Sequence, residues 1–336
     1  MKKILTGALA AGLAVMMIFS GCGGSNQSAS AEKETEAAEV KATEAATVKA
    51  VDNNGDYKKV KYEVVEGEAS ITGLKDKSLK KLTIPSFIKG NAVTRISANA
   101  FENNKSLKEV EILEGIDNIG AGAFKNCAKL EEVDLPDTVT SIGGFAFEGC
   151  NKLSDIELPD KLESIAMQAF AGCTSIEEIT IPDSVSLLND NTFNGCTGLE
   201  KIKLSENITR IGSNIFEGCT SLEKIKLPDS LFMLGGYAFK DCKGLEEIDF
   251  GKGVSNIGVR IFEGCESVKK LNFPDNVTTI GNFTFYGCKK LSDVTFSDNI
   301  KSIGSNAFAS CAISKVTVPK SCNVNDKAFD KGVKVN

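Results

Sequence analysis

The sequence predicts an α/β repeat fold, a solenoid of stacked 23-residue coils that combine short parallel strands with turns. A Phe followed three residues later by a Cys recurs nine times at a spacing of 23, with no insertion or deletion. A pair of alternating apolar residues precedes each Phe at a fixed distance, and all seven prolines directly follow such a pair. A fixed period of this length indicates one supersecondary unit stacked on itself. The nine pairs are Phe124/Cys127, Phe147/Cys150, Phe170/Cys173, Phe193/Cys196, Phe216/Cys219, Phe239/Cys242, Phe262/Cys265, Phe285/Cys288 and Phe308/Cys311.

The first part of each coil is expected to be a short strand with one buried face. In the coil that begins at Leu130, Val133 and Leu135 alternate with Glu132 and Asp134. This period-2 pattern is typical of a half-buried strand. The proline that often follows has no N–H to donate, so it ends the strand pairing. Stacked copies of this strand predict one long parallel sheet.

The rest of each coil is expected to return the chain to the next strand. A second apolar pair, Val139 and Ile142, indicates a second short extended piece, and about one helical turn is expected through Ala146 and Phe147. The residue before each repeat Cys is Gly, Asn, Asp or Ser. Those residues are preferred where the backbone leaves a helical turn with positive φ. Each coil would bury its Phe and several aliphatic side chains against its neighbours.

The repeat unit resembles a known family. Its pattern is L-x-x-[IV]-x-[LIF]-P-[DE]-x-[VIL]-x-x-[IL]-G-x-x-A-F-x-[GN]-C-x-x, which is similar to bacterial leucine-rich repeats of the treponemal or BspA-like class. The resemblance covers an array over residues 97–319 and implies a right-handed leucine-rich repeat solenoid with its strand sheet on one face. It also implies a cell-surface or secreted protein associated with adhesion and protein binding. Residues 56–96 are expected to form an N-terminal cap with the first coil, and residues 320–336 a C-terminal cap.

The N-terminus is expected to be a signal peptide over residues 1–21, with two lysines ahead of an apolar run. The segment Phe19–Cys22 resembles the lipobox of bacterial lipoproteins. That resemblance implies lipidation of Cys22, so that the protein contacts the membrane through its lipid anchor only. An ordinary cleaved signal peptide, and hence a secreted protein, is the alternative. Residues 22–55 contain almost no large apolar side chain, which predicts a disordered tether behind the lipidated Cys.

The repeat cysteines are expected to be reduced, buried thiols. Identical side chains at a fixed period point the same way, and free Cys behaves as a small buried hydrophobe. A disulfide array is the alternative in an exported protein, because stacked strands lie ~4.8 Å apart, within the Cα separation that a disulfide tolerates. Zinc is not expected, because the chain has no His and no CxxC pair. We expect no metal and no cofactor.

Catalysis is not expected either. The absence of His removes Ser-His-Asp and Cys-His mechanisms and the commonest proton shuttle. An array without insertions also lacks the long loops on which active sites are usually built. Nucleic acid is not an expected partner, because the net charge is −6 and phosphate neutralisation needs clustered cations.

The outward residues of the first strand carry charges that are segregated along the array. Acids occupy these positions in four adjacent coils, and lysines occupy them in the next two. Like charges on neighbouring strands repel each other, so a ligand surface would explain their stacking. A solvated face kept soluble by charge is the alternative. The candidate ligand-binding residues are Glu109, Glu111, Glu132, Asp134, Asp155, Glu157, Lys201, Lys203, Lys224 and Lys226.

These observations together predict a cell-surface, non-catalytic protein-binding or adhesion module. Its expected partner is a protein of a host or of a neighbouring cell, with host extracellular matrix among the candidates. A structural envelope spacer or scaffold lipoprotein with no external ligand is the alternative. The sequence specifies neither the ligand nor the oligomeric state.

Overall fold

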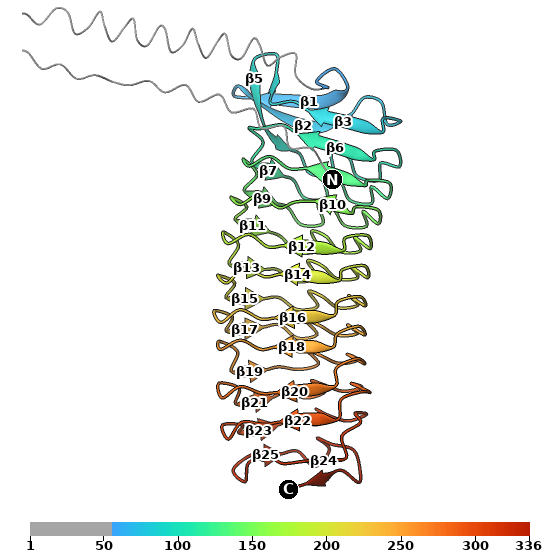
Figure 1. Ribbon diagram of the computed structural model, residues 1–336. Coiled ribbons are helices and arrows are strands. Elements are labelled where there is room, and N and C mark those ends of the chain that lie inside the picture. Colours follow the sequence, from blue (N-terminus) through green and yellow to red (C-terminus); the bar gives the residue numbers. More distant parts are fainter. Residues whose placement is uncertain (1–55) are drawn as a thin grey trace, which may run out of the picture. The chain divides into compact units, whose positions relative to one another are not determined.

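The computed structural model describes residues 56–336. This unit is a stack of coils, each with a strand, a turn, a second strand and a run of turns that leads to the next coil (Figure 1). The expected signal peptide and the expected tether with Cys22 lie outside the described residues. Between residues 56 and 336 there is no helix of the length and apolarity needed to cross a membrane.

The first strands of the coils lie side by side in parallel register and form what we call the strand face (Figure 1). Glu109 pairs with Glu132 and Val110 with Val133, so equivalent residues of successive coils are neighbours. Strand pairing is unbroken from β3 to β10. Beyond β10 the strands form separate two-stranded pairs, so the one long sheet predicted from the sequence is interrupted. Most of these strands are two or three residues long, so few hydrogen bonds join each junction. The strands are β3 (Lys81–Ile84), β6 (Glu109–Ile112), β8 (Glu132–Asp134), β10 (Asp155–Ile156), β12 (Glu178–Thr180), β14 (Lys201–Lys203), β16 (Lys224–Lys226), β18 (Glu247–Asp249), β20 (Lys270–Asn272), β22 (Asp293–Thr295), β24 (Lys315–Val316) and β26 (Lys334–Val335).

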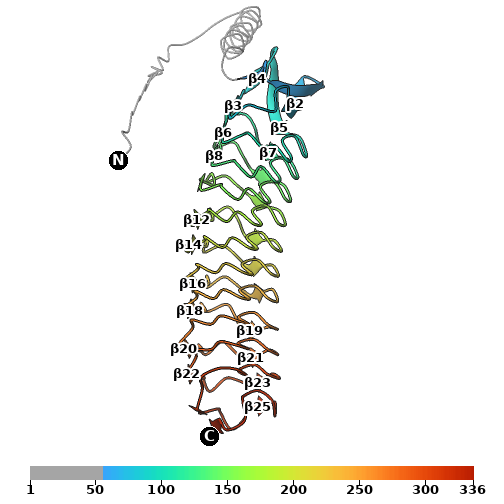
Figure 2. The ribbon, with the colours of Figure 1, turned by 90° about the vertical axis from the view of Figure 1, so that its right-hand side faces the viewer.

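The expected second extended piece is confirmed as a second parallel ladder on another side of the stack (Figure 2). Ile119 pairs with Ile142, and both side chains are buried. Each strand contributes one inward aliphatic residue to the core and one outward residue to the surface. The strands are β7 (Asn118–Ile119), β9 (Ser141–Ile142), β11 (Ser164–Ile165), β13 (Leu187–Leu188), β15 (Arg210–Ile211), β17 (Met233–Leu234), β19 (Asn256–Ile257), β21 (Thr279–Ile280), β23 (Ser302–Ile303) and β25 (Asn323–Val324).

The expected helical turn is absent, since no residue from 56 to 336 is helical; the chain around Phe147 forms a run of turns. The Ala146 N–H donates to the Gly143 carbonyl in its own coil, whereas the Phe147 N–H donates to the Ala169 carbonyl of the next coil at 2.8 Å. Alternate N–H groups thus bond within and between coils, which a helix does not allow because every N–H bonds along its own axis. A positive φ at Phe145 also interrupts helical geometry. The positive φ predicted before each repeat Cys is confirmed at all nine positions.

Behind these turns, the core contains a column of Phe rings and a column of Cys thiols. Rings of successive coils, from Phe101 to Phe329, stack with centroids 5.0–5.7 Å apart. The Cys150 thiol donates to the Phe124 carbonyl of the preceding coil at 3.1 Å, and the same oxygen accepts the Cys127 N–H at 3.0 Å. Burial raises the pKa of the Cys127 thiol to about 12, so it stays protonated and unreactive at neutral pH.

The two ends of the stack are built differently from its middle. At the N-terminal end, β1 and β2 form an antiparallel pair, and β4 and β5 form a hairpin. The hairpin turns through Lys89 and Gly90, whose φ values of 53° and 84° suit a two-residue turn with both φ positive. Asn104 takes the place of the first Cys, and its Oδ1 accepts the N–H groups of Ser106 and Leu107. The cap strands are β1 (Val60–Val65), β2 (Glu68–Leu74), β4 (Phe87–Ile88) and β5 (Asn91–Ile96).

Candidate binding surface

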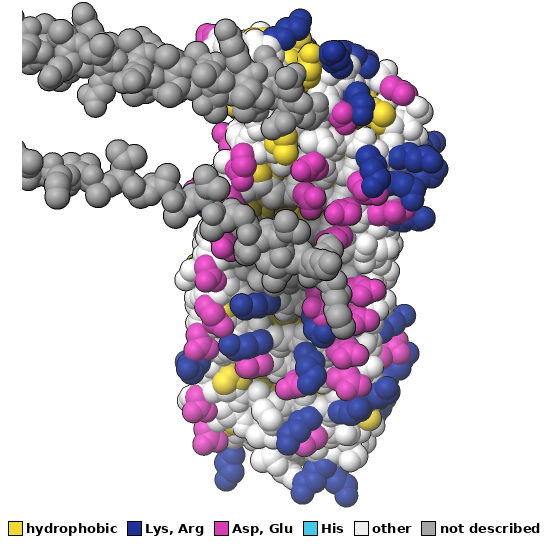
Figure 3. Space-filling view, turned by 45° about the horizontal axis from the view of Figure 1, so that its top comes forward, with side chains coloured by type: hydrophobic (Ala, Val, Ile, Leu, Met, Phe, Trp, Pro, Cys, Tyr) yellow, Lys and Arg dark blue, Asp and Glu magenta, His cyan; other side chains and the backbone are white. Residues whose placement is uncertain are grey.

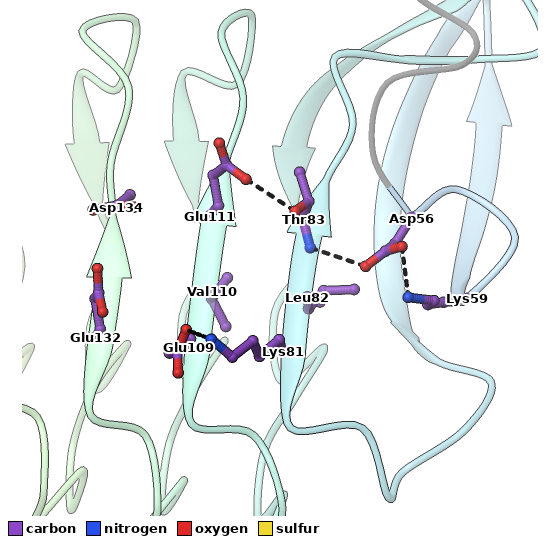
Figure 4. Close-up of a pocket in the computed structure, with 10 residues that line it drawn as sticks. All are labelled: Asp56, Lys59, Lys81, Leu82, Thr83, Glu109, Val110, Glu111, Glu132 and Asp134. Atoms are coloured by element: carbon purple, nitrogen blue, oxygen red, sulfur yellow. Dashed lines mark hydrogen bonds and ion pairs between the residues drawn. The ribbon is translucent and has the colours of Figure 1, made fainter. Parts of the chain in front are cut away.

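The outward side chains of the strand face come from the residues that flank each buried strand residue. Val133 is buried, while its neighbours Glu132 and Asp134 lie on the outer side of the strand. Figure 4 shows these two acids beside the equivalent pair Glu109 and Glu111. Because the coils are in register, these side chains stand in two columns along the array, with neighbouring strands ~4.8 Å apart. All ten candidate residues predicted from the sequence lie on strands of this face or directly beside them.

The six acids on or directly beside β6, β8 and β10, here called the acidic zone, place like charges in register. Glu109 pairs with Glu132, which in turn pairs with Asp155. Two of the six carboxylates have side-chain partners at the N-terminal edge of the zone. Lys81 forms an ion pair with Glu109, and the Thr83 hydroxyl donates to Glu111 at 2.9 Å. The other four make no ion pair with any residue that the structure describes. These unpaired acids are Glu132, Asp134, Asp155 and Glu157.

The four lysines of β14 and β16, here called the lysine zone, are largely paired with acids on neighbouring coils. Three ion pairs involve them: Lys201 with Glu178, Lys224 with Glu247 at 2.9 Å, and Lys226 with Glu206 at 2.8 Å. The hydrogen bonds that these ammonium groups donate raise their pKa values above the ordinary 10.5. Among the described residues, Lys203 alone of the four has no ion pair. The three paired side chains are 66–71% exposed, so their pairs contribute little to stability.

Among the hollows that open on this face, two adjoin the charged zones. The first, of about 250 Å³, lies between the acidic zone and Lys81 (Figure 4). The second, of about 440 Å³, lies at the edge of the lysine zone, where Lys203 and Lys226 stand beside the apolar Leu204 and Pro228. Figure 3 shows charged side chains of both signs on the visible side of the stack, with few apolar ones between them. Over residues 56–336, no three Cys, Asp or Glu side chains are grouped so as to hold a metal ion.

An exposed apolar patch lies elsewhere on the stack and was missed from the sequence. Phe232 and Met233 lie on or beside β17 and are 60% and 46% exposed. Tyr237 and Val259 lie in the turns of this coil and the next, and the Tyr237 N–H donates to the Val259 carbonyl. The other coils carry polar residues at the position of Phe232. A comparison of the residues at each equivalent position of the 23-residue repeat, including positions outside the strand face, would have found this patch.

The fold and the candidate residues define a class of protein: a scaffold of repeated coils without long loops, whose candidate binding residues lie on the sides of the stack. The family described as "BspA type Leucine rich repeat region (6 copies)" matches residues 72–166, 117–233 and 209–336. The chain therefore belongs to this family, as the repeat pattern predicted. Membership suggests a protein-interaction or adhesion-type module and names no ligand. No curated protein matches the chain.

Solved structures with similar folds come from several bacteria. A leucine rich cell surface protein from Faecalibacterium prausnitzii A2-165 is 24% identical, with a TM-score of 0.58 over 82% of this chain and 86% of that one. A leucine-rich repeat protein from T. pallidum is 26% identical, with a TM-score of 0.39 over 76% and 87%. The pneumococcal vaccine antigen PcpA is 21% identical, with a TM-score of 0.48 over 82% and 91%. The first of these supports the fold assignment.

Proposed function

We propose that this protein is an exported, surface-anchored and non-catalytic module that binds a macromolecular ligand along its strand face. In this proposal Cys22 carries the lipid anchor, residues 22–55 form the tether, and the ligand is a protein of a host matrix or of a neighbouring cell. The description of the Faecalibacterium protein as a cell surface protein supports the location. The observation that carries the binding role is the segregation of the acidic and lysine zones on one exposed face.

The acidic zone supports a binding role for this face over a merely solvated surface. Its four unpaired carboxylates come from adjacent strands in parallel register, so each repels its neighbours. A ligand with cations at matching spacing relieves that repulsion and gains interaction energy. The second hollow adds apolar contact beside Lys203, which a polypeptide with acidic and aliphatic side chains could use.

The rival function, a structural spacer with no external ligand, is favoured by the ion pairs that already neutralise three lysines of the lysine zone. The two functions differ in what they expect of salt. A binding face that depends on exposed charges loses affinity as ionic strength rises, because exposed charges are screened within ~10 Å at 0.1 M salt. A spacer shows no such binding at any salt concentration.

The test is capture of purified extracellular matrix proteins by the immobilised full chain at low and high salt. The lysine-zone variant should capture at least about tenfold less ligand if that ligand contacts the lysines, since like-charge contacts replace opposite-charge contacts. Its four substitutions are Lys201→Glu, Lys203→Glu, Lys224→Glu and Lys226→Glu. A matched control carries the same charge change at exposed lysines outside the strand face. Its four substitutions are Lys129→Glu, Lys152→Glu, Lys243→Glu and Lys290→Glu.

A third variant, Phe232→Ser with Tyr237→Ser, removes the apolar patch and leaves the strand face intact. Capture that survives in this variant and in the matched control, but is lost in the lysine-zone variant, supports the strand face. Equal capture by all four proteins removes the lysine zone from the proposal. Loss only in the Phe232→Ser and Tyr237→Ser variant would place the ligand on the apolar patch.

A further inference from the structure

The charge pattern of the strand face is complementary to itself. The four unpaired acids lie on or beside β8 and β10, the lysine zone lies on β14 and β16, and β12 lies between them. A two-fold axis in the contact plane and along β12 places β14 of one copy opposite β10 of the other, and β16 opposite β8. We propose that the strand face binds a second copy of this chain in this antiparallel, face-to-face arrangement.

Every lysine of the lysine zone then meets an acid that has no ion pair within the described part of its own chain. In one column of side chains, Lys201 faces Asp155 and Lys224 faces Glu132 of the second copy. In the other column, the remaining two lysines face the remaining two unpaired acids. The symmetry repeats each contact twice, because a two-fold interface joins the same patch on both copies. The in-chain lysine pairs are exposed and weak, so they compete little with these contacts.

The orientation and the extent of the contact follow from the same pattern. A parallel arrangement would set the lysine zone on the lysine zone and acids on acids. In the antiparallel arrangement, Glu178 meets its own copy at the axis, and this one like-charge contact is outweighed by the lysine–acid contacts on both sides of it. Beyond the zones, β18 would face β6, and both carry acids. That repulsion ends the contact, which leaves five coils on each copy.

A contact of this size is weak for a single pair of molecules. Five coils at ~4.8 Å spacing, with strands about 10 Å long, bury roughly 500 Å² in total, below the ~1,200 Å² of standard interfaces. Many copies on one surface compensate through multivalency. The stack begins at residue 56, so antiparallel partners have this residue at opposite ends of the contact. With the surface anchoring proposed above, on which this step rests, that is the geometry of molecules on two facing cells.

The test uses the full chain coupled to beads through its N-terminus. We expect wild-type beads to aggregate at ~50 mM salt and to lose at least about tenfold of that aggregation at ~500 mM. Beads with the lysine-zone variant alone, or with an acidic-zone variant alone, should stay dispersed. A mixture of the two variants should aggregate within about twofold of wild type, because the reversed lysine zone then faces the reversed acids. The acidic-zone substitutions are Glu132→Lys, Asp134→Lys, Asp155→Lys and Glu157→Lys.

The mixture is decisive because unfolded variants cannot restore each other. The matched control variant should aggregate like wild type. Wild-type beads that stay dispersed at low salt, or a mixture that stays dispersed, would overturn the self-binding inference. Capture of a matrix protein by dispersed beads would support the proposed function and contradict self-binding. Aggregation without capture of any matrix protein would support self-binding and remove the host ligand.

Discussion

The Phe–Cys core and the strand face are both columns of equivalent residues, yet they repeat to different degrees. In the core, nine coils carry the same Phe and the same Cys, and each thiol bonds to the coil before it. On the strand face, the outward residue changes from acid to lysine and back along the array. Repetition therefore stabilises the stack, since identical side chains pack on themselves. Variation at outward positions distinguishes one part of the surface from another.

The largest expected effect comes from the thiols of the core. Burial raises the pKa of eight repeat cysteines above the ordinary 9.0, to about 12 for Cys127 and Cys196. Below pH 9 both states hold the proton, whereas above it only the unfolded state releases it. The contribution of these thiols to the free energy of unfolding is therefore complete below pH 9. It falls as pH rises toward 12, by about 1.4 kcal/mol per pH unit for each thiol. Denaturant titrations from about pH 8 to 10 measure this loss.

A variant with fewer buried thiols tests whether they cause this pH dependence of the free energy of unfolding. Replacing Cys173 and Cys242 by Ala should lower the stability at neutral pH but make its decline above pH 9 shallower, since fewer protons are released on unfolding. A stability that does not change between about pH 8.5 and 10 in the wild type would contradict the role given to the buried thiols.

The ring column predicts the next largest effect. Phe193 is fully buried between Phe170 and Phe216, with centroid distances of 5.5 and 5.7 Å. Its replacement by Ala should cost about 3–5 kcal/mol of unfolding free energy, because a large cavity opens mid-array. Within residues 56–336, Phe329 stacks on a single ring, Phe308, and is half-buried. The same substitution there should cost clearly less, and equal losses in chemical denaturation would argue against a continuous column.

The start of the Cys column predicts a smaller effect. Asn104 accepts the N–H groups of Ser106 and Leu107 at 2.8 and 2.9 Å and is almost fully buried. Asn104→Ala should lower the unfolding free energy by about 1–3 kcal/mol, because it leaves two donors unsatisfied. Asn104→Asp keeps the accepting oxygen and serves as the control. An Ala variant as stable as wild type would show that water replaces the side chain.

The smallest expected effect on stability belongs to the strand face. The lysine-zone variant should melt only about 2–4 °C below the wild type, because both the ion pairs that it loses and the like-charge contacts that it gains are exposed and screened. Because the pKa of Lys201 is raised above 10.5, its pairing with Glu178 contributes fully to stability below pH 10.5, and this contribution is lost as the pH rises from there through the raised pKa. Thermal melts of this variant and of the matched control variant make the comparison. A large loss of stability would show that the charged residues of the strand face are needed to hold the fold together.

Much of this molecule can be predicted from its sequence, and most of what was not predicted depends on bonds between coils. The period, the burial of Phe147, the positive φ at Gly149 and the shared face of Glu132 and Lys201 all follow from local pattern and register. The helical turn through Phe147 was a wrong prediction because its N–H bonds to a residue 22 positions later. Local propensity contains no information about such a bond. The ion pairs of the lysines join coils in the same way, through side-chain conformations that the repeat does not specify.

The sequence by itself determined that this chain is a stack of 23-residue coils, which residues of each coil face inward, and which charges lie on each strand. A strict period allows only one way to bury the same face of every copy. The tertiary structure decided how the alternate N–H groups divide between coils, where the strand ladder breaks, and which charged residues pair across coils. These outcomes depend on distances between neighbouring coils, which exist only once the chain has wound upon itself.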